Sequence, residues 1–134
     1  MPRQKQLFKH VPTLGGIALY YGIILVDLLL ILGKDRNASN ALVAEVSSHI
    51  SNFAISSLLV SLLAFIMTLQ GAPFKFVIWL GVIAILMNFI VEVLINFLNT
   101  PDILDAVYGT AGVVLTVAAM YVFSRIGLRE PSEK

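Results

Sequence analysis

The sequence predicts an all-α protein, a polytopic membrane protein built as one bundle of four transmembrane helices. Three observations lead to this fold class. The 134-residue chain is 58% hydrophobic and only 13% charged, which is too little charge to keep a soluble domain of this length dispersed. Four apolar stretches reach the length of about 20 residues that a helix needs to cross a bilayer. These stretches are continuous, whereas the strands of a membrane β-barrel alternate in polarity over segments of about 10 residues.

The four predicted spans form a single transmembrane domain, and residues typical of helix ends bound them. The spans cover residues 14–32, 41–69, 74–98 and 102–126. Either Ser39 or Asn40 is suited to cap the second span, and Pro73 suits the first turn of the third. We expect Thr100 to cap the fourth span and Asp102 to lie in its first turn, where an acid interacts favourably with the helix dipole.

Basic residues predict which way the chain crosses the membrane. With four spans, both tails and the connection between the second and third spans lie on one side. Seven of the nine lysines and arginines fall on that side: Arg3, Lys5, Lys9, Lys75, Arg125, Arg129 and Lys134. Because short cytoplasmic segments are enriched in basic residues, we expect both termini to be cytoplasmic. The predicted location is therefore the cytoplasmic membrane of the cell, crossed four times.

The acidic residues are predicted to gather at the outer face of the membrane. Connectivity brings six of the eight acids to that face, and only Glu130 and Glu133 lie elsewhere. At about 100° per residue, Glu45, His49 and Asn52 share one side of the second span. Because a charged side chain in contact with lipid is costly, we expect the polar sides of the spans to turn toward one another.

This pattern predicts an outward-facing pocket of acids and one histidine that binds a ligand, with Glu92 as its deepest carboxylate. The candidate ligand-binding residues are Glu45, His49, Asn52, Glu92, Asn96, Asp105 and Asp27. Since neighbouring carboxylates repel one another, a cation, an amine or a proton would stabilise the pocket. We assign no catalytic residue, no metal ligand and no cofactor. The expected partners are membrane lipids and a small-molecule or lipid-linked envelope ligand, without nucleic acid, and a homo-oligomer is left open.

Small residues predict close packing between the spans. The second span carries serines at short intervals, and Gly109 and Gly112 occur in the fourth. Small residues let the backbones of membrane helices approach closely. We therefore interpret these positions as packing residues rather than as parts of a site.

Three short polar motifs follow one another between Glu45 and the end of the fourth span. Glu45 and His49, four residues apart, open the second span, and Glu92 lies at the end of the third. Ile103-Leu104-Asp105 follows a short turn, with Gly112 seven residues after the aspartate. In this order and topology the motifs resemble those of the VanZ-like family of small bacterial membrane proteins.

The chain also departs from the pattern of that family. Val46 stands where the family has a lysine, and Gly109 where it has a polar residue. Asn96 lies one position beyond the usual glutamine, and Asn99-Thr100-Pro101 replaces a Pro-Gly-Arg turn. The resemblance implies a multi-pass protein of the bacterial cytoplasmic membrane that is linked to the cell envelope and to resistance to glycopeptide antibiotics, notably teicoplanin.

Four functions fit this pocket. The first is an envelope protein that binds or handles an outer-leaflet component. The second is an ion- or proton-coupled small transporter or a channel subunit, although the inner halves of the second and fourth spans offer almost no polar path. The third is an intramembrane enzyme in which His49 pairs with Glu92 or Asp105 as acid and base or holds a metal, although no nucleophile stands out. The fourth is a passive helper whose polar cluster only holds the helices together.

Overall fold

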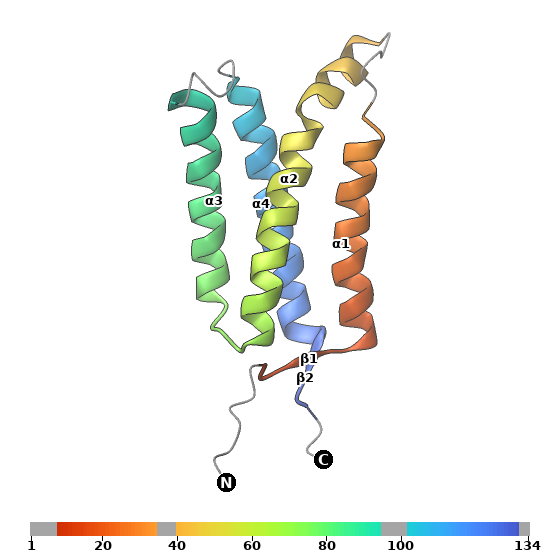
Figure 1. Ribbon diagram of the computed structural model, residues 1–134, viewed down its shortest axis with the longest axis vertical. Helices are drawn as coiled ribbons and strands as arrows, with labels where there is room; N and C mark the ends of the chain where they lie inside the picture. Colours follow the sequence, from red (N-terminus) through yellow and green to blue (C-terminus); the bar gives the residue numbers. More distant parts are fainter. Residues whose placement is uncertain (1–7, 35–39, 95–101, 132–134) are drawn as a thin grey trace.

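The computed structural model describes residues 8–34, 40–94 and 102–131, and its main elements are four long helices that run side by side as a bundle (Figure 1). The helices are α1 (Leu14–Leu32), α2 (Ala41–Leu69), α3 (Lys75–Leu94) and α4 (Ile103–Ile126). A short antiparallel pair of strands, β1 (Val11–Pro12) and β2 (Leu128–Arg129), closes one end of the bundle. All four helices are long and apolar enough to cross a membrane. The predicted fold class, a four-helix transmembrane bundle, is therefore confirmed, and the chain is a multi-pass membrane protein.

The helix ends agree with the predicted spans to within one residue where the structure describes them. α1 and α2 have the predicted bounds, α3 begins at Lys75 and α4 at Ile103, and residues 95–98 of the predicted third span lie outside the described residues. Asn40 caps α2, because its Oδ1 accepts hydrogen bonds from the backbone N–H groups of Leu42 (2.9 Å) and Val43 (3.4 Å).

The start of α4 differs from the prediction. Asp102 is itself the N-cap and accepts a hydrogen bond from the N–H of Leu104 at 2.9 Å, so it does not lie inside the first turn. A carboxylate at the cap satisfies a backbone N–H that would otherwise lack a partner, and it also interacts favourably with the helix dipole. Thr100, the predicted cap, lies outside the described residues.

Small residues bring α2 and α4 together in the centre of the bundle. A Cβ added at Gly112 would clash with the backbone carbonyl of Phe53, so the two helices are in backbone contact there. A Cβ added at Gly109 would lie 2.6 Å from the side-chain nitrogen of Asn88 on α3. The glycines therefore act as packing residues, as the sequence predicts, and they set the distances between the polar groups of three helices.

The outer surface of the bundle is largely apolar. Leu25, Trp79, Leu86 and Leu115 are each more than half exposed, and they come from three different helices. A water-soluble protein rarely exposes so much continuous apolar surface. This surface suits contact with membrane lipid, which supports lipids as partners of the chain.

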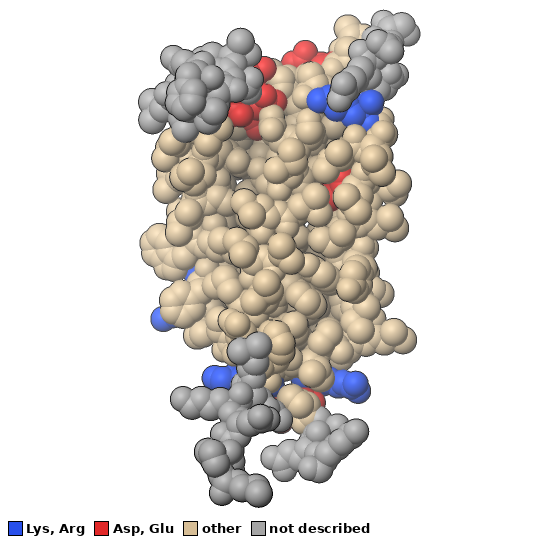
Figure 2. All heavy atoms as spheres, in the orientation of Figure 1, with Lys and Arg blue, Asp and Glu red and all other residues tan. Residues whose placement is uncertain are grey.

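Charges divide the bundle into two ends (Figure 2). We call the end where α2 and α4 begin the acidic end; it carries Glu45, Glu92, Asp102 and Asp105. We call the opposite end, where β1 and β2 pair, the tail end; it carries Lys9, Lys75, Arg125 and Arg129. Lys34 belongs to the acidic end and Glu130 to the tail end, so the separation of charge is strong but incomplete.

Candidate functional site

A histidine–aspartate pair lies at the acidic end and joins α2 to α4. His49 Nδ1 is 2.7 Å from Asp105 Oδ1, which is a short hydrogen-bonding distance. The His49 residue is only 6% exposed, and the Asp105 side chain is 14% exposed. His49 lies two turns into α2, and Asp105 lies in the first turn of α4, so the parallel start of these two helices brings the residues together. The pair is therefore held by the fold and is not a chance surface contact.

Two further carboxylates surround the same imidazole. Asp102 Oδ2 is 3.8 Å from His49 Nδ1, and Glu45 Oε1 is 3.9 Å from His49 Nε2. Both distances exceed the range of a hydrogen bond but lie within the limit of about 4 Å for an ion pair. The side chains of Glu45 and Asp102 are 58% and 41% exposed. We call Glu45, His49, Asp102 and Asp105 the His49 cluster. Its three carboxylates against one imidazole give it an excess of negative charge that an external cation would neutralise.

The His49 cluster also has the donor atoms of a metal site. One ligand atom each from His49, Asp102 and Asp105 lies within 4.8 Å of the other two. Zinc binds such nitrogen and oxygen atoms at about 2.0–2.2 Å, so the three would need to approach one another slightly to share one ion. Three protein ligands with one open position is the usual arrangement at a catalytic zinc. From the sequence, a metal at His49 belongs only to the enzyme alternative, with Glu92 or Asp105 as its neighbour. The structure instead groups His49 with Asp102 and Asp105, because α2 packs against α4.

Asp27 lies apart from the His49 cluster, inside the bundle. Its side chain accepts a hydrogen bond from Ser57 Oγ at 2.6 Å, and Ser57 Oγ is also 2.6 Å from Thr116 Oγ1. We call Asp27, Ser57 and Thr116 the Asp27 network; its residues come from α1, α2 and α4. Ser57 is eight residues beyond His49 on α2, which corresponds to about 12 Å along a helix. The structure therefore places Asp27 roughly two turns deeper than the rest of the predicted pocket.

The depth of the carboxylates also differs from the prediction. Asp27 is 2% exposed and is the most buried carboxylate among the described residues, whereas Glu92 is half-buried. Hydroxyl groups on α2 and α4 make this burial feasible, because they offer hydrogen bonds that lipid cannot. The prediction that Glu92 is the deepest carboxylate is therefore wrong.

A second polar contact joins α2 to α3. Ser56 Oγ donates to Asn88 Oδ1 at 3.1 Å, and Gly109 on α4 leaves room for this amide. Asn88 Nδ2 is buried and has no hydrogen-bond partner among the described residues. One turn toward the acidic end from this contact lie Asn52 on α2 and Glu92 on α3, both half-buried.

The predicted site residues thus fall into three groups. Glu45, His49 and Asp105 meet in the His49 cluster. Asn52 and Glu92 lie one helical turn from the Ser56–Asn88 contact, and Asp27 belongs to the Asp27 network. Asn96 lies outside the described residues. That these residues bind a ligand stays a prediction.

Lys34 is a neighbour of this site that sequence reasoning assigns to a loop. Its Nζ donates to the backbone carbonyl of Ser48 at 3.2 Å and to Ser51 Oγ at 3.1 Å. The contact fixes the segment that follows α1 against the turn of α2 that contains His49. Only its position just beyond the last turn of α1 could have indicated this role.

Comparison with models of protein families found no match, and comparisons with curated proteins and with solved structures found none either.

Proposed function

We propose that this chain is a VanZ-like protein of the bacterial cytoplasmic membrane that binds a cationic, amine-bearing component of the cell envelope at its acidic end. One observation carries the proposal: a buried histidine is held by Asp105 and faces the exposed carboxylates of Glu45 and Asp102. The order of the polar motifs, which resembles the VanZ-like pattern, supports the same assignment.

The division of burial within the His49 cluster suits binding of an amine. His49 and Asp105 are mostly buried and keep their geometry, while Glu45 and Asp102 are exposed enough to reach a ligand. An ammonium group has three N–H donors, and ionised carboxylates are acceptors only. Charge-assisted hydrogen bonds of this kind are roughly twice as strong as neutral ones. The cluster would therefore hold an amine while its buried part stays in place.

Spermidine is a suitable probe for this binding, because the envelope ligand itself is unidentified. We expect spermidine to raise the melting temperature of the purified wild-type protein and to lose this effect in His49→Gln and Asp105→Asn. Glu130→Gln removes an acid at the tail end and should keep the full effect. An equal response of all four proteins would mean that spermidine binds acidic surface in general, and would contradict the proposal.

The resemblance adds a test in living cells. We expect the wild-type chain to lower the susceptibility of a bacterium to teicoplanin, with the effect lost in His49→Gln and kept in Glu130→Gln. Western blotting of the membrane fraction provides the control for expression. Protection that persists in His49→Gln would remove the His49 cluster from this function.

The same proposal has both tails in the cytoplasm and the acidic end outside. The basic residues of the tail end, Lys9, Lys75, Arg125 and Arg129, support this orientation. Because the chain has no cysteine, single cysteines at the exposed positions Asn40 and Gln70 can be labelled without background. A membrane-impermeant thiol reagent added to intact cells should label position 40 and spare position 70, and the reverse pattern would invert the orientation.

A divalent metal ion is a second candidate ligand, favoured by the grouping of His49, Asp102 and Asp105. Glu45 separates the two candidates, because it belongs to the His49 cluster but not to this group of three. Glu45→Gln should weaken binding of spermidine and leave binding of Zn²⁺ unchanged. Metal analysis of the purified protein, together with Zn²⁺ titrations of the wild type and Asp102→Asn, decides whether the metal binds.

A further inference from the structure

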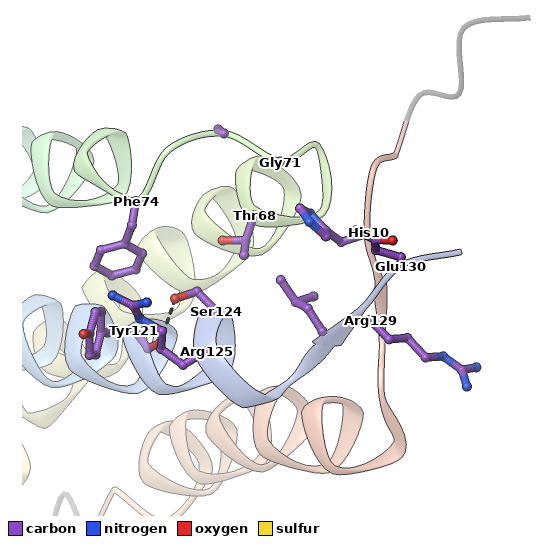
Figure 3. Close-up of a pocket in the computed structure, with 11 residues that line it drawn as sticks. His10, Thr68, Gly71, Phe74, Tyr121, Ser124, Arg125, Arg129 and Glu130 are labelled. Carbon is purple, nitrogen blue, oxygen red and sulfur yellow. Dashed lines mark hydrogen bonds between the residues drawn. The ribbon is translucent and has the colours of Figure 1, made fainter. Parts of the chain in front are cut away.

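A pocket of about 470 Å³ lies at the tail end of the bundle (Figure 3). It is formed where the turn between α2 and α3, the last turn of α4 and the segment before β1 meet. We call it the tail-end pocket and define it by His10, Thr68, Gly71, Phe74, Ser124 and Arg125. We propose that the tail-end pocket binds the phosphate group of an anionic lipid headgroup.

Arg125 supplies the cation of this pocket. Its guanidinium lies over the ring of Tyr121, 5.1 Å from the ring centroid, and Phe74 packs edge-on against the same ring with centroids 5.3 Å apart. Among the described residues, no ion pair involves Arg125. The aromatic contacts therefore orient the guanidinium without neutralising it, and its five N–H donors can bind phosphate oxygens.

His10 supplies a second polar group. Its Nδ1 is buried and has no hydrogen-bond partner within the described part of the chain. The ring is held in place, because the backbone N–H of His10 donates to the carbonyl of Leu69 at 3.0 Å and the ring packs against Gly71. A buried polar atom without a partner is costly, and a ligand that completes its hydrogen bonding removes this cost. In one tautomer Nδ1 carries the proton and can donate to a phosphate oxygen.

The aliphatic hydroxyl groups of the pocket, those of Ser124 and Thr68, are already engaged. Ser124 Oγ donates to the carbonyl of Tyr121 at 2.7 Å, and Thr68 Oγ1 donates to the carbonyl of Ala64 at 2.6 Å. Arg125 and His10 therefore have donors that Ser124 and Thr68 do not, and Arg125, which carries the positive charge, is the residue to test.

The charge around the pocket favours an anion. Among the described residues that line it, Arg125 and Arg129 are basic and Glu130 is acidic, and Lys9 lies beside Gly71. Figure 3 shows Glu130 beside His10 and the side chain of Arg129 directed away from the pocket, so Arg125 is the basic group closest to its interior. Basic groups at the membrane surface attract anionic lipids.

The position of the pocket favours a lipid over a soluble anion. It lies where the apolar helices end, and Tyr121 is 46% exposed beside it. On α3, Phe76 and Trp79 are 47% and 62% exposed. Tyrosine and tryptophan side chains are enriched at the level of lipid headgroups. A headgroup in the pocket would therefore keep its acyl chains against the apolar surface of the bundle.

The first test compares the full-length protein in nanodiscs of phosphatidylcholine with and without phosphatidylglycerol. We expect phosphatidylglycerol to raise the melting temperature of the wild type by about 4 °C. Arg125→Gln should lose most of this increase. Lys75→Gln is the matched control, because Lys75 lies at the same end but does not line the pocket, and it should keep the increase.

The proposal is overturned if phosphatidylglycerol has no effect on the wild type, or if Arg125→Gln and Lys75→Gln lose the increase equally. Inorganic phosphate added to phosphatidylcholine nanodiscs distinguishes the two sources of the anion. We expect it to leave the melting temperature unchanged, and an increase as large as that with phosphatidylglycerol would overturn the assignment to a lipid.

A second measurement needs no variant and so does not depend on Arg125→Gln being folded. Wild-type protein released from an equimolar mixture of the two lipids into a mass spectrometer should retain phosphatidylglycerol in preference to phosphatidylcholine, and equal retention would count against the site. The inference is independent of the proposed function, because Arg125→Gln should leave the spermidine response of the His49 cluster intact.

Discussion

The His49 cluster and the Asp27 network place acids in the same membrane bundle but differ in how completely the protein satisfies them. Asp27 is buried and accepts a hydrogen bond from Ser57, which in turn contacts Thr116. In the His49 cluster, one imidazole faces three carboxylates, of which two are substantially exposed. The first arrangement is closed, whereas the second has negative charge and acceptor oxygens to spare.

This difference in hydrogen bonding distinguishes a stabilising network from a binding site, whereas the sequence places all these acids in one pocket. A closed network of hydrogen bonds between helices contributes to stability, although such bonds average only about 0.6 kcal/mol in membrane proteins. An open cluster with excess charge contributes little to stability and often lowers it, because groups arranged for a ligand are not arranged for one another. The Asp27 network should therefore act as a support and the His49 cluster as a site.

Gly112→Leu should have the largest effect, because it separates α2 from α4 and disrupts both regions at once. Its side chain would meet the backbone of Phe53, and overpacking of this kind costs about 3 kcal/mol of unfolding free energy. Denaturation in mixed micelles followed by circular dichroism measures the change. Gly22→Ala is the control, because no described atom lies within 4 Å of the added Cβ, and it should not destabilise. Equal losses in the two variants would show that the contact is not specific.

Asp105→Asn should weaken binding and leave stability nearly intact. The loss of one charge should weaken spermidine binding about tenfold, which corresponds to about 1.4 kcal/mol. The free energy of unfolding should stay constant or rise, because repulsion among the carboxylates decreases. Isothermal titration calorimetry and micelle denaturation on the same preparation give both values. A large loss of stability with unchanged binding would assign the His49 cluster to support instead.

Asp27→Leu should give the opposite result. Ser57 Oγ loses its acceptor, and the unfolding free energy should fall by about 1 kcal/mol. Spermidine binding should stay at the wild-type level, because Asp27 is about 12 Å from His49 along the bundle. Asp27→Asn keeps an acceptor oxygen and should recover most of the stability. If Asp27→Leu abolished binding while folding normally, the two regions would form one site.

Lys34→Met should have the smallest effect, about 0.5 kcal/mol of unfolding free energy. Its Nζ holds the end of α1 against Ser51 and the carbonyl of Ser48, close to the His49 cluster but without belonging to it. A double-mutant cycle with Ser51→Ala isolates the side-chain contact, since only coupled residues give non-additive changes. Strictly additive losses would show that the contact contributes nothing in the membrane.

The sequence predicts the spans well because length and hydropathy determine them. The bounds of α1 and α2 match the prediction, and the antiparallel order of the helices brings Glu45, His49 and Asp105 to one end without any knowledge of packing. Periodicity also identifies which side of each helix is polar. It does not give the rotation of one helix against another, which depends on contacts such as that between Gly112 and Phe53.

That rotation decides the features that the sequence leaves unpredicted. Asp27 turns toward Ser57 and Thr116 and not toward His49, and Asp102 joins the His49 cluster as the cap of α4. The tail-end pocket could not be predicted from the sequence either, because its residues come from three segments that are far apart in the sequence and include no recognisable motif. Only the packed structure combines them.

The pairing of β1 with β2 has a consequence for how the protein is made. Val11 pairs with Arg129, and the N–H of Thr13 donates to the carbonyl of Gly127, so the beginning of α1 is fastened to residues that are synthesised after α4. Asp27 likewise gains its hydrogen-bond donor Ser57 only when α2 has been synthesised, and Ser57 gains its neighbour Thr116 only with α4. α1 therefore makes its full set of contacts only after α4 has been synthesised, and the hydrogen-bond network around Asp27 is complete only then.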